Sequence, residues 1–261
     1  MLLSPCIEWI FKAEHPDFCD RIRAAKAAGF EVVEFHMWRD KTLADVERTL
    51  TETGVRISSF LVEPRVCLTD PSAESATLTA VKDSLPIARR LESPALVVAS
   101  GPIIAGREPA EQRAAMLNVL RKAARMAEDA GITLLLEPVN TRVDHPGVFL
   151  DLTPDGLDLI EEIGSPRVRL LYDMYHSRCM GESPAEVLGQ RMHLVGHVQV
   201  ADAPGRHEPG SGAIDWRRYM NVLREKGYRG AIGLEYRPSG DSLESLKRAR
   251  ASLTPSGAAA A

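Results

Sequence analysis

The stretch AEDAGITLLLEPV, residues 127–139, decides the fold of this chain. An amphipathic helix pattern ends at Gly131, and a leucine-rich run follows at once and closes on Glu137. Glycine just past a helix adopts the left-handed conformation that closes the last turn, and a short apolar run bounded in this way is typical of a buried strand. The stretch therefore predicts a helix followed directly by a strand.

The same arrangement recurs around Gly29, Gly54 and Gly227. Regular alternation of strands and helices predicts a parallel sheet, and eight such units predict closure into a single (β/α)8 TIM barrel, an α/β fold. No GxGxxG follows the first strand, which argues against a dinucleotide-binding fold. The predicted strands cover residues 5–11, 31–37, 55–62, 95–100, 132–138, 168–174, 194–200 and 231–236. The predicted helices cover residues 17–28, 41–53, 73–91, 109–130, 154–163, 184–192, 216–226 and 242–252.

Composition indicates an ordinary soluble enzyme-sized chain. It has 261 residues, 44% apolar and 26% charged, with a net charge of -4. We expect one catalytic domain over residues 1–253 and a disordered tail over residues 254–261. A mildly acidic chain has no electrostatic attraction to nucleic acid or anionic lipid, so we expect neither as a partner. A homo-oligomer remains open.

The cysteines, the apolar runs and the first residues of the sequence together predict where the protein is located in the cell. The four cysteines, Cys6, Cys19, Cys67 and Cys179, are far apart and form no CxxC pair, which favours a reducing compartment. The apolar runs are too short to span a bilayer, and the first residues lack the features of a signal peptide. We therefore expect a cytoplasmic protein.

Four acceptor side chains stand at the ends of four successive predicted strands: Glu137, Asp173, Gln199 and Glu235. In a parallel barrel these ends share one mouth, where barrel enzymes place their chemistry. Each acid could instead cap the next helix or pair with an arginine. Burying several carboxylates together without a cation costs several kcal/mol each, so four in succession favour a site for Mg²⁺ or Mn²⁺.

Other polar residues flank this predicted site. His176 follows Asp173 and either binds a substrate oxygen or forms an ordinary hydrogen bond. His197 shares a strand face with Gln199, which favours a packed supporting role over a ligand role. Glu34 and His36 share a face of the second strand, where a buried hydrogen-bonded pair and a substrate contact are equally compatible with the sequence.

The polar, glycine-rich run ADAPGRHEPGSGAIDW, residues 201–216, follows the seventh predicted strand. Within it Arg206 is the best candidate to hold an anion or a hydroxyl group of a substrate. Gly210 and Gly212 either allow the backbone to approach a ligand or shape a turn. The run therefore predicts a substrate-binding loop.

These segments resemble the hydroxypyruvate isomerase family of the xylose isomerase-like TIM barrel superfamily. The resemblance is carried by LLLEPVNTR (134–142), HPGVFL (145–150), LYDMYH (171–176), GHVQVADAPGRHEPGSG (196–212) and GLEY (233–236). It is strong over residues 130–238 and weaker before them. It implies a divalent metal held by Glu137, Asp173, Gln199 and Glu235, with Glu137 and Glu235 as the proton-transfer pair.

Two features depart from related patterns. The related ketose 3-epimerases have His in place of Gln199 and a Glu where this chain has Val143, which counts against a 3-epimerase. The segment after the second predicted strand is HMWR, residues 36–39, where family members often carry an aromatic or Pro-Tyr segment. The resemblance therefore leaves the substrate open.

We predict a metal-dependent isomerase of the aldose–ketose type that acts on a small hydroxy-keto acid or sugar. Hydroxypyruvate converted to tartronate semialdehyde through an enediolate is the favoured reaction, with the cation and two carboxylates assisting proton transfer. Alternatives are a dehydratase of a sugar-derived ketone, an isomerase or epimerase of 2-oxotetronate or another ketose, and a non-catalytic sugar-binding protein. An abasic-site endonuclease is more remote, because the net charge is -4.

Overall fold

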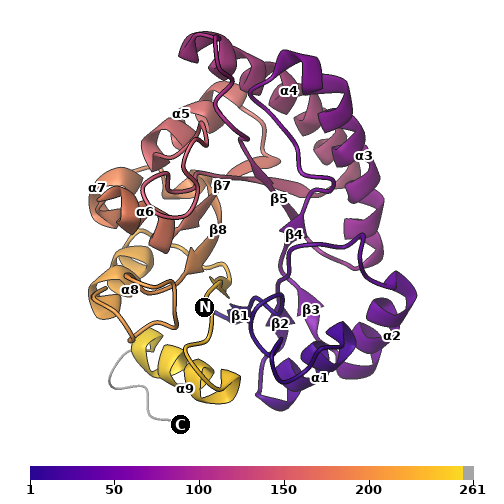
Figure 1. The fold of residues 1–261 in the computed structure, drawn as a ribbon, viewed down its shortest axis with the longest axis vertical. Coiled ribbons are helices and arrows are strands. Elements are labelled where there is room, and N and C mark those ends of the chain that lie inside the picture. The colour runs from indigo at the N-terminus through magenta and orange to yellow at the C-terminus, as the bar shows by residue number, and fades with distance from the viewer. Residues whose placement is uncertain (255–261) are drawn as a thin grey trace.

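A computed structural model describes residues 1–254, and its strands alternate with helices throughout that range (Figure 1). The strands are β1 Leu3–Pro5, β2 Val32–Val33, β3 Arg56–Ile57, β4 Phe60–Leu61, β5 Ala95–Ala99, β6 Thr133–Glu137, β7 Val168–Asp173, β8 Val195–Val200 and β9 Ile232–Leu234. The α-helices are α1 Phe18–Ala27, α2 Leu43–Thr53, α3 Glu74–Arg90, α4 Pro109–Ala130, α5 Thr153–Ile163, α6 Met174–Met180, α7 Pro184–Leu188, α8 Trp216–Glu225 and α9 Ser242–Leu253. Two 3₁₀ turns occupy Pro71–Ala73 and Met192–Leu194.

The strands form a curled, parallel sheet in the order β1-β9-β8-β7-β6-β5-β4, and β2 pairs separately with β3. A parallel bridge between Cys6 and Glu34 joins β1 to β2, and the amide of Leu61 donates to the carbonyl of His36 at 3.0 Å. These links complete the circuit, and helices surround the strands (Figure 1). The predicted TIM barrel is confirmed.

Three details of the prediction were wrong. The strand expected over residues 55–62 is divided into β3 and β4, because its pairing partner changes along its length: β3 pairs with β2, and β4 pairs with β5. The strand expected over residues 5–11 lies earlier, at Leu3–Pro5, and shares only Pro5 with the prediction, and the strand expected over residues 31–37 is reduced to Val32–Val33. Helix α6 begins directly after β7, in a segment expected to be a loop, since Asp173 accepts from the amides of Tyr175 and His176 and caps it.

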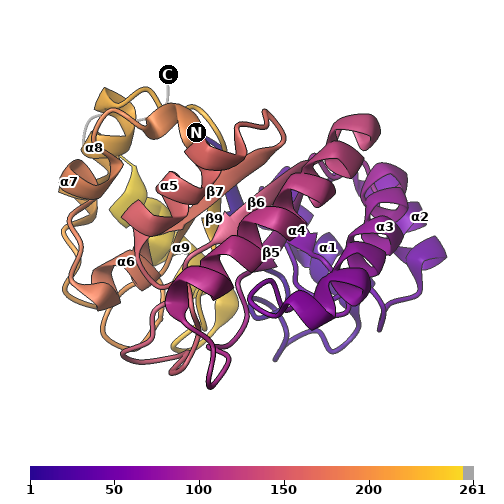
Figure 2. The ribbon, with the colours of Figure 1, turned by 90° about the horizontal axis from the view of Figure 1, so that it is seen from above.

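Apolar packing forms two layers. Inside the barrel, Ala95, Val97, Leu135 and Leu171 make a separate buried cluster beneath the mouth. Outside it, the helices press apolar stripes on the strands, and α3 lies beside α4 (Figure 2). The stripe predicted on α4 is buried as expected, at Met116, Leu120, Ala123 and Ala127. Burial of this kind stabilises a fold by about 25 cal/mol per Å² of apolar surface.

Helix α4 ends as the sequence predicts. Gly131 has a φ of 73°, a left-handed conformation, and its amide bonds to carbonyls of the last turn. Within residues 1–254, no helix is both long and apolar enough to cross a membrane. The predicted single domain over residues 1–253 stays a prediction, and the tail predicted over residues 254–261 lies outside the described residues but for its first position.

Candidate active site

The four predicted acceptor residues meet at the C-terminal mouth of the barrel. Glu137 and Asp173 are the last residues of β6 and β7, Gln199 lies near the end of β8, and Glu235 directly follows β9. All four are buried, with at most 9% of their surface exposed. Arg206 joins two of them, with Nη2 lying 2.8 Å from Glu235 Oε2 and 3.8 Å from Asp173 Oδ2.

Two buried oxygens at this mouth have no hydrogen-bond partner among residues 1–254: Oδ2 of Asp173 and Oε1 of Gln199. The other oxygen of Asp173 accepts the amide of Tyr175 at 2.7 Å. A buried polar atom without a partner costs about 1–3 kcal/mol, so such atoms call for a missing partner. Carboxylate and amide oxygens are the donors that Mg²⁺ and Mn²⁺ prefer, so these residues fit a divalent cation.

The amide of Gln199 is held in one orientation by Glu34. Gln199 Nε2 donates to Glu34 Oε1 at 2.7 Å, and a carboxylate can only accept, so the NH₂ group faces Glu34. The other carboxylate oxygen pairs with His197 Nε2 at 2.8 Å. Gly233 provides the space, because a Cβ there would collide with the Glu34 carboxylate. Gln199 therefore keeps its carbonyl oxygen away from Glu34.

His176 presents an N–H group to the site. The backbone amide of Asn140 donates to His176 Nδ1 at 3.2 Å, and a backbone N–H can only donate. Burial, with the nearby charge of Arg206, lowers the pKa of His176 to about 3, so the ring is neutral and carries its proton on Nε2. That atom lies 3.8 Å from Glu137 Oε1 and 3.7 Å from Asp173 Oδ2. This favours a donor to oxygen over a metal ligand.

The carboxylates differ in their affinity for protons. Burial raises the pKa of Glu137 well above its usual range, and the charges of Glu235 and Asp173 add to this effect. Burial also raises the pKa of Asp173 to about 7, although Arg206 opposes the shift. Burial alone would raise the pKa of Glu235, but Arg206 and His36 hold it well below its usual range. Arg206 and His36 thus make Glu235 bind a proton less readily than Glu137 does.

Arg206 is fixed by the loop that carries it. Its φ of 55° is unusual for a residue with a side chain. Buried Asp202 organises the loop, since its carboxylate accepts from the amide of Gly210 at 2.7 Å and from Trp216 Nε1 at 2.8 Å. The Arg206 guanidinium lies over the ring of Trp9, 4.9 Å from its centroid. Its Nε has no hydrogen-bond partner in residues 1–254 and can donate to a ligand.

The two glycines of the loop have structural roles. A Cβ at Gly210 would collide with Ser252, and one at Gly212 would collide with Asp202 and the backbone of Ala203. Both positions pack against protein, so the turn-shaping alternative accounts for them.

A cavity of about 530 Å³ opens over the site. Its lining includes apolar residues such as Leu61, Val66, Val97 and Val148. The polar residues of the lining are Glu137, Glu235, His176, Arg206, His36, His145 and Arg65. A cavity with a few polar groups converging at one end is typical of a site for a small organic molecule.

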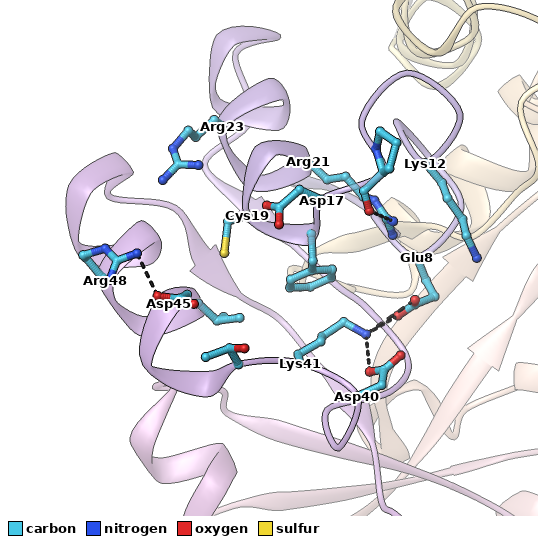
Figure 3. Close-up of a pocket in the computed structure, with 14 residues that line it drawn as sticks. Glu8, Lys12, Asp17, Cys19, Arg21, Arg23, Asp40, Lys41, Asp45 and Arg48 are labelled. Carbon is cyan, nitrogen blue, oxygen red and sulfur yellow. Dashed lines mark hydrogen bonds and ion pairs between the residues drawn. The ribbon is translucent and has the colours of Figure 1, made fainter.

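Of the two alternatives for Glu34 and His36, the structure does not show the hydrogen-bonded pair, and His36 lines the cavity. Its Nε2 lies 2.7 Å from Glu235 Oε1, whereas Glu34 bonds to Gln199 and His197. Glu8 supports this position by accepting the amide of His36 at 3.2 Å, and Lys41 lies 3.1 Å from the same carboxylate oxygen (Figure 3). His36 could be singled out in the sequence because it stands near the end of a predicted strand. Glu8 could not be singled out, because the residues that it contacts are distant from it in the sequence.

Comparison with known proteins places this barrel in a family. The profile of the xylose isomerase-like TIM barrel family matches residues 22–254, which is most of the chain. The chain belongs to that family.

Individual proteins that are similar to this chain indicate which activity within the family it resembles. A protein from Homo sapiens described as a putative hydroxypyruvate isomerase is 31% identical over 255 residues, 93% of this chain and 92% of its own length. The 2-oxo-tetronate isomerase of Cupriavidus necator is 33% identical, with 85% of this chain and 87% of its own covered. A crystal structure described as AP endonuclease, family 2, from Brucella melitensis has a TM-score of 0.88 at 28% identity and covers 94% of this chain and 96% of its own. The two relatives described as isomerases support the predicted isomerase, and the solved structure supports the fold.

Proposed function

We propose that the protein is a divalent-metal-dependent isomerase that converts hydroxypyruvate to tartronate semialdehyde by proton transfer through an enediolate. Two observations support this proposal: the unpartnered oxygens of Asp173 and Gln199, and relatives whose names describe hydroxypyruvate and 2-oxo-tetronate isomerases. In the proposal, Mg²⁺ or Mn²⁺ is held by Glu137, Asp173, Gln199 and Glu235. When bound, the cation supplies Lewis-acid stabilisation of the negative charge that develops on the substrate oxygens.

The chain's own residues carry the proton. One carboxylate removes a proton from the hydroxymethyl carbon of hydroxypyruvate, and a proton is then returned to the neighbouring carbonyl carbon. Glu235, whose pKa is held low, is the base at the start of this cycle. Glu137 completes the proton-transfer pair and returns a proton to the substrate. Positioned acid–base groups of this kind contribute about 10²- to 10⁴-fold to a rate.

The remaining polar groups orient the substrate. His176 and Arg206 both line the cavity, so their N–H groups can hold carboxylate or hydroxyl oxygens. The Arg206 charge adds affinity for a keto acid over a neutral sugar. The apolar residues of the lining offer no competing hydrogen bonds, which leaves the orientation of the substrate to these donors.

A four-carbon keto acid is the second candidate substrate. The cavity of about 530 Å³ is larger than hydroxypyruvate requires, and the Cupriavidus necator relative is described as a 2-oxo-tetronate isomerase. The proposed chemistry is the same for both, since each has a hydroxyl-bearing carbon beside the carbonyl. We propose cytoplasmic small-molecule metabolism as the setting.

The reaction in D₂O tests the proposal. Purified protein is incubated with hydroxypyruvate and Mn²⁺, then with 2-oxotetronate, and the products are analysed by mass spectrometry and NMR against samples without protein. An enediolate route exchanges the shuttled proton with solvent, so we expect deuterium on the carbon that receives it. Conversion without any deuterium uptake would contradict proton transfer by the two glutamates. A product lighter by one water would make the protein a dehydratase.

A further inference from the structure

A second group of metal-ligand side chains lies beside the proposed oxygen-donor site. Cys6, His36 and Glu235 place a sulfur, a ring nitrogen and a carboxylate oxygen within 4.8 Å of one another. They lie just beyond the ends of β1, β2 and β9, which neighbour one another in the barrel. Cys6 is fully buried, and it lies behind His36 and Glu235, both of which line the cavity. A cation can therefore reach this group from the substrate cavity.

The geometry is close to a tetrahedral zinc cage. With about 2.3 Å to sulfur and about 2.0 Å to nitrogen or oxygen, tetrahedral zinc sets S and N about 3.5 Å apart and N and O about 3.3 Å apart. In the protein, Cys6 Sγ lies 3.4 Å from His36 Nε2, and His36 Nε2 lies 2.7 Å from Glu235 Oε1. The first edge already fits. The second is a hydrogen bond that opens by about 0.6 Å once an ion replaces its proton.

The two carboxylate oxygens of Glu235 face different neighbours. Oε1 points to His36, whereas Oε2 bonds to Arg206 at 2.8 Å. Glu235 can thus serve the sulfur-containing group through one oxygen and the oxygen-donor site through the other. Three protein ligands leave a fourth tetrahedral position for a water or a substrate, as in catalytic zinc sites.

We propose that Cys6, His36 and Glu235 form a second cation site, selective for thiophilic divalent ions such as Zn²⁺. Thiolate selects zinc-like ions, whereas the all-oxygen donor set beside it suits Mg²⁺ and Mn²⁺. Binding forms Zn–S, Zn–N and Zn–O bonds, and the thiol and imidazole protons that it displaces pass to solvent. No oxidant or reductant is involved.

Occupation of this site has a functional consequence that rests on the proposed role of Glu235 as base. A zinc ion on Oε1 and on His36 neutralises the carboxylate and lowers its basicity. Zn²⁺ therefore inhibits turnover even when Mn²⁺ saturates the oxygen-donor site. Binding of Zn²⁺ at this second site therefore switches turnover off, and its release restores turnover as the concentration of free zinc falls.

Spectroscopy tests the site independently of turnover. The full chain is titrated with Co²⁺ in excess Mg²⁺, and the thiolate-to-cobalt charge-transfer band and the tetrahedral d–d bands are followed. We expect both to saturate at one Co²⁺ per chain. They should vanish in Cys6→Ser and persist in Cys19→Ser, which removes a half-buried thiol on α1. Absence of the band in the wild type, or its survival in Cys6→Ser, would overturn the site.

A second variant and a kinetic measurement complete the test. If Cys6→Ser does not fold, His36→Asn carries the experiment and should weaken Co²⁺ binding at least tenfold. Where an active substrate is known, the Zn²⁺ concentration for half-inhibition should rise at least tenfold in Cys6→Ser relative to Cys19→Ser, each compared with its own uninhibited rate. Equal inhibition would overturn the coupling to Glu235. Failure of every isomerase assay would refute the proposed function and leave the cobalt titration unaffected.

Discussion

Replacing Glu34 with methionine tests whether the buried carboxylate orients Gln199 toward a cation. Methionine keeps the length of the side chain but removes both acceptors, so Gln199 Nε2 and His197 Nε2 lose bonds of 2.7 and 2.8 Å. The freed amide can then turn its NH₂ group into the proposed metal site. Loss of such a supporting hydrogen bond lowers metal affinity about 10- to 100-fold, equivalent to about 1.4–2.8 kcal/mol.

Fold stability should fall as well, because a buried donor left unpaired costs about 1–3 kcal/mol. For a domain of this size that is a decrease in Tm of about 2–12 °C. Glu182→Met is the matched control: Glu182 also accepts several bonds, including Ser177 Oγ at 2.7 Å, but does not line the cavity. Calorimetric titration with Mn²⁺ and thermal unfolding of the metal-free protein separate the two effects.

The predicted result is weaker Mn²⁺ binding in Glu34→Met alone, with a lower Tm in both variants. Glu34→Gln should recover part of the affinity, since its carbonyl can accept from Gln199 while His197 changes tautomer. Unaltered Mn²⁺ affinity in Glu34→Met would refute the reasoning that Glu34 holds Gln199 in place.

Three further predictions concern the metal, the glutamates and pH. Removal of metal with a chelator should abolish turnover, and Mn²⁺ at about 100 times its Kd should restore it and add about 2.7 kcal/mol, a rise of about 5–11 °C in Tm by calorimetry. Glu137→Gln and Glu235→Gln should each remain folded by circular dichroism yet lose about 10²- to 10⁴-fold in kcat, and near-normal turnover in either would contradict its role. Glu208 has a lowered pKa, since bonds from Ser239 and the charge of Arg248 outweigh burial, so its stabilising effect is present above its unfolded pKa and is lost as pH falls through the folded value. The difference in unfolding free energy between the wild type and Glu208→Gln, measured with urea, should therefore shrink as the pH falls below about 4; a constant difference would show that Glu208 does not act through its charge.

The sequence allowed prediction of features that depend on local pattern. The apolar run of β6 ends on Glu137 and that of β7 on Asp173, and a parallel barrel necessarily brings such ends together. Partners across the barrel could not be predicted in the same way. Gln199 and Glu34 are 165 positions apart, and their bond depends on the space above Gly233. Hydrophobic periodicity does not predict such a contact, because the contact depends both on the register of the strands and on the rotamers of the two side chains.

The same limit explains why β3 and β4 were predicted as one strand. Residues 55–62 have strand-forming composition, but the hydroxyl of Ser58 bonds to Ser4 at 2.8 Å and to Glu34 Oε2 at 3.3 Å. These bonds satisfy polar groups inside the barrel while the ladder is interrupted. β-propensity does not say which strand each residue pairs with: the Ser58 amide donates to the carbonyl of Val33 at 2.9 Å, whereas Phe60 and Leu61 pair with β5.

The residues that close the barrel between β1 and β4 also lie beside the proposed active site. Strands β1 to β4 are short. The barrel is closed there by residues of the proposed sites: Cys6 forms a parallel bridge with Glu34, and the carbonyl of His36 accepts a hydrogen bond from the amide of Leu61. The oxygen donors, in contrast, come from the longer strands β6 to β8 and from the end of β9. The long strand β6 therefore carries Glu137, while residues beside the short strands surround Glu235. Substitutions at Cys6 or His36 should alter cation choice and substrate range before they alter the kind of reaction.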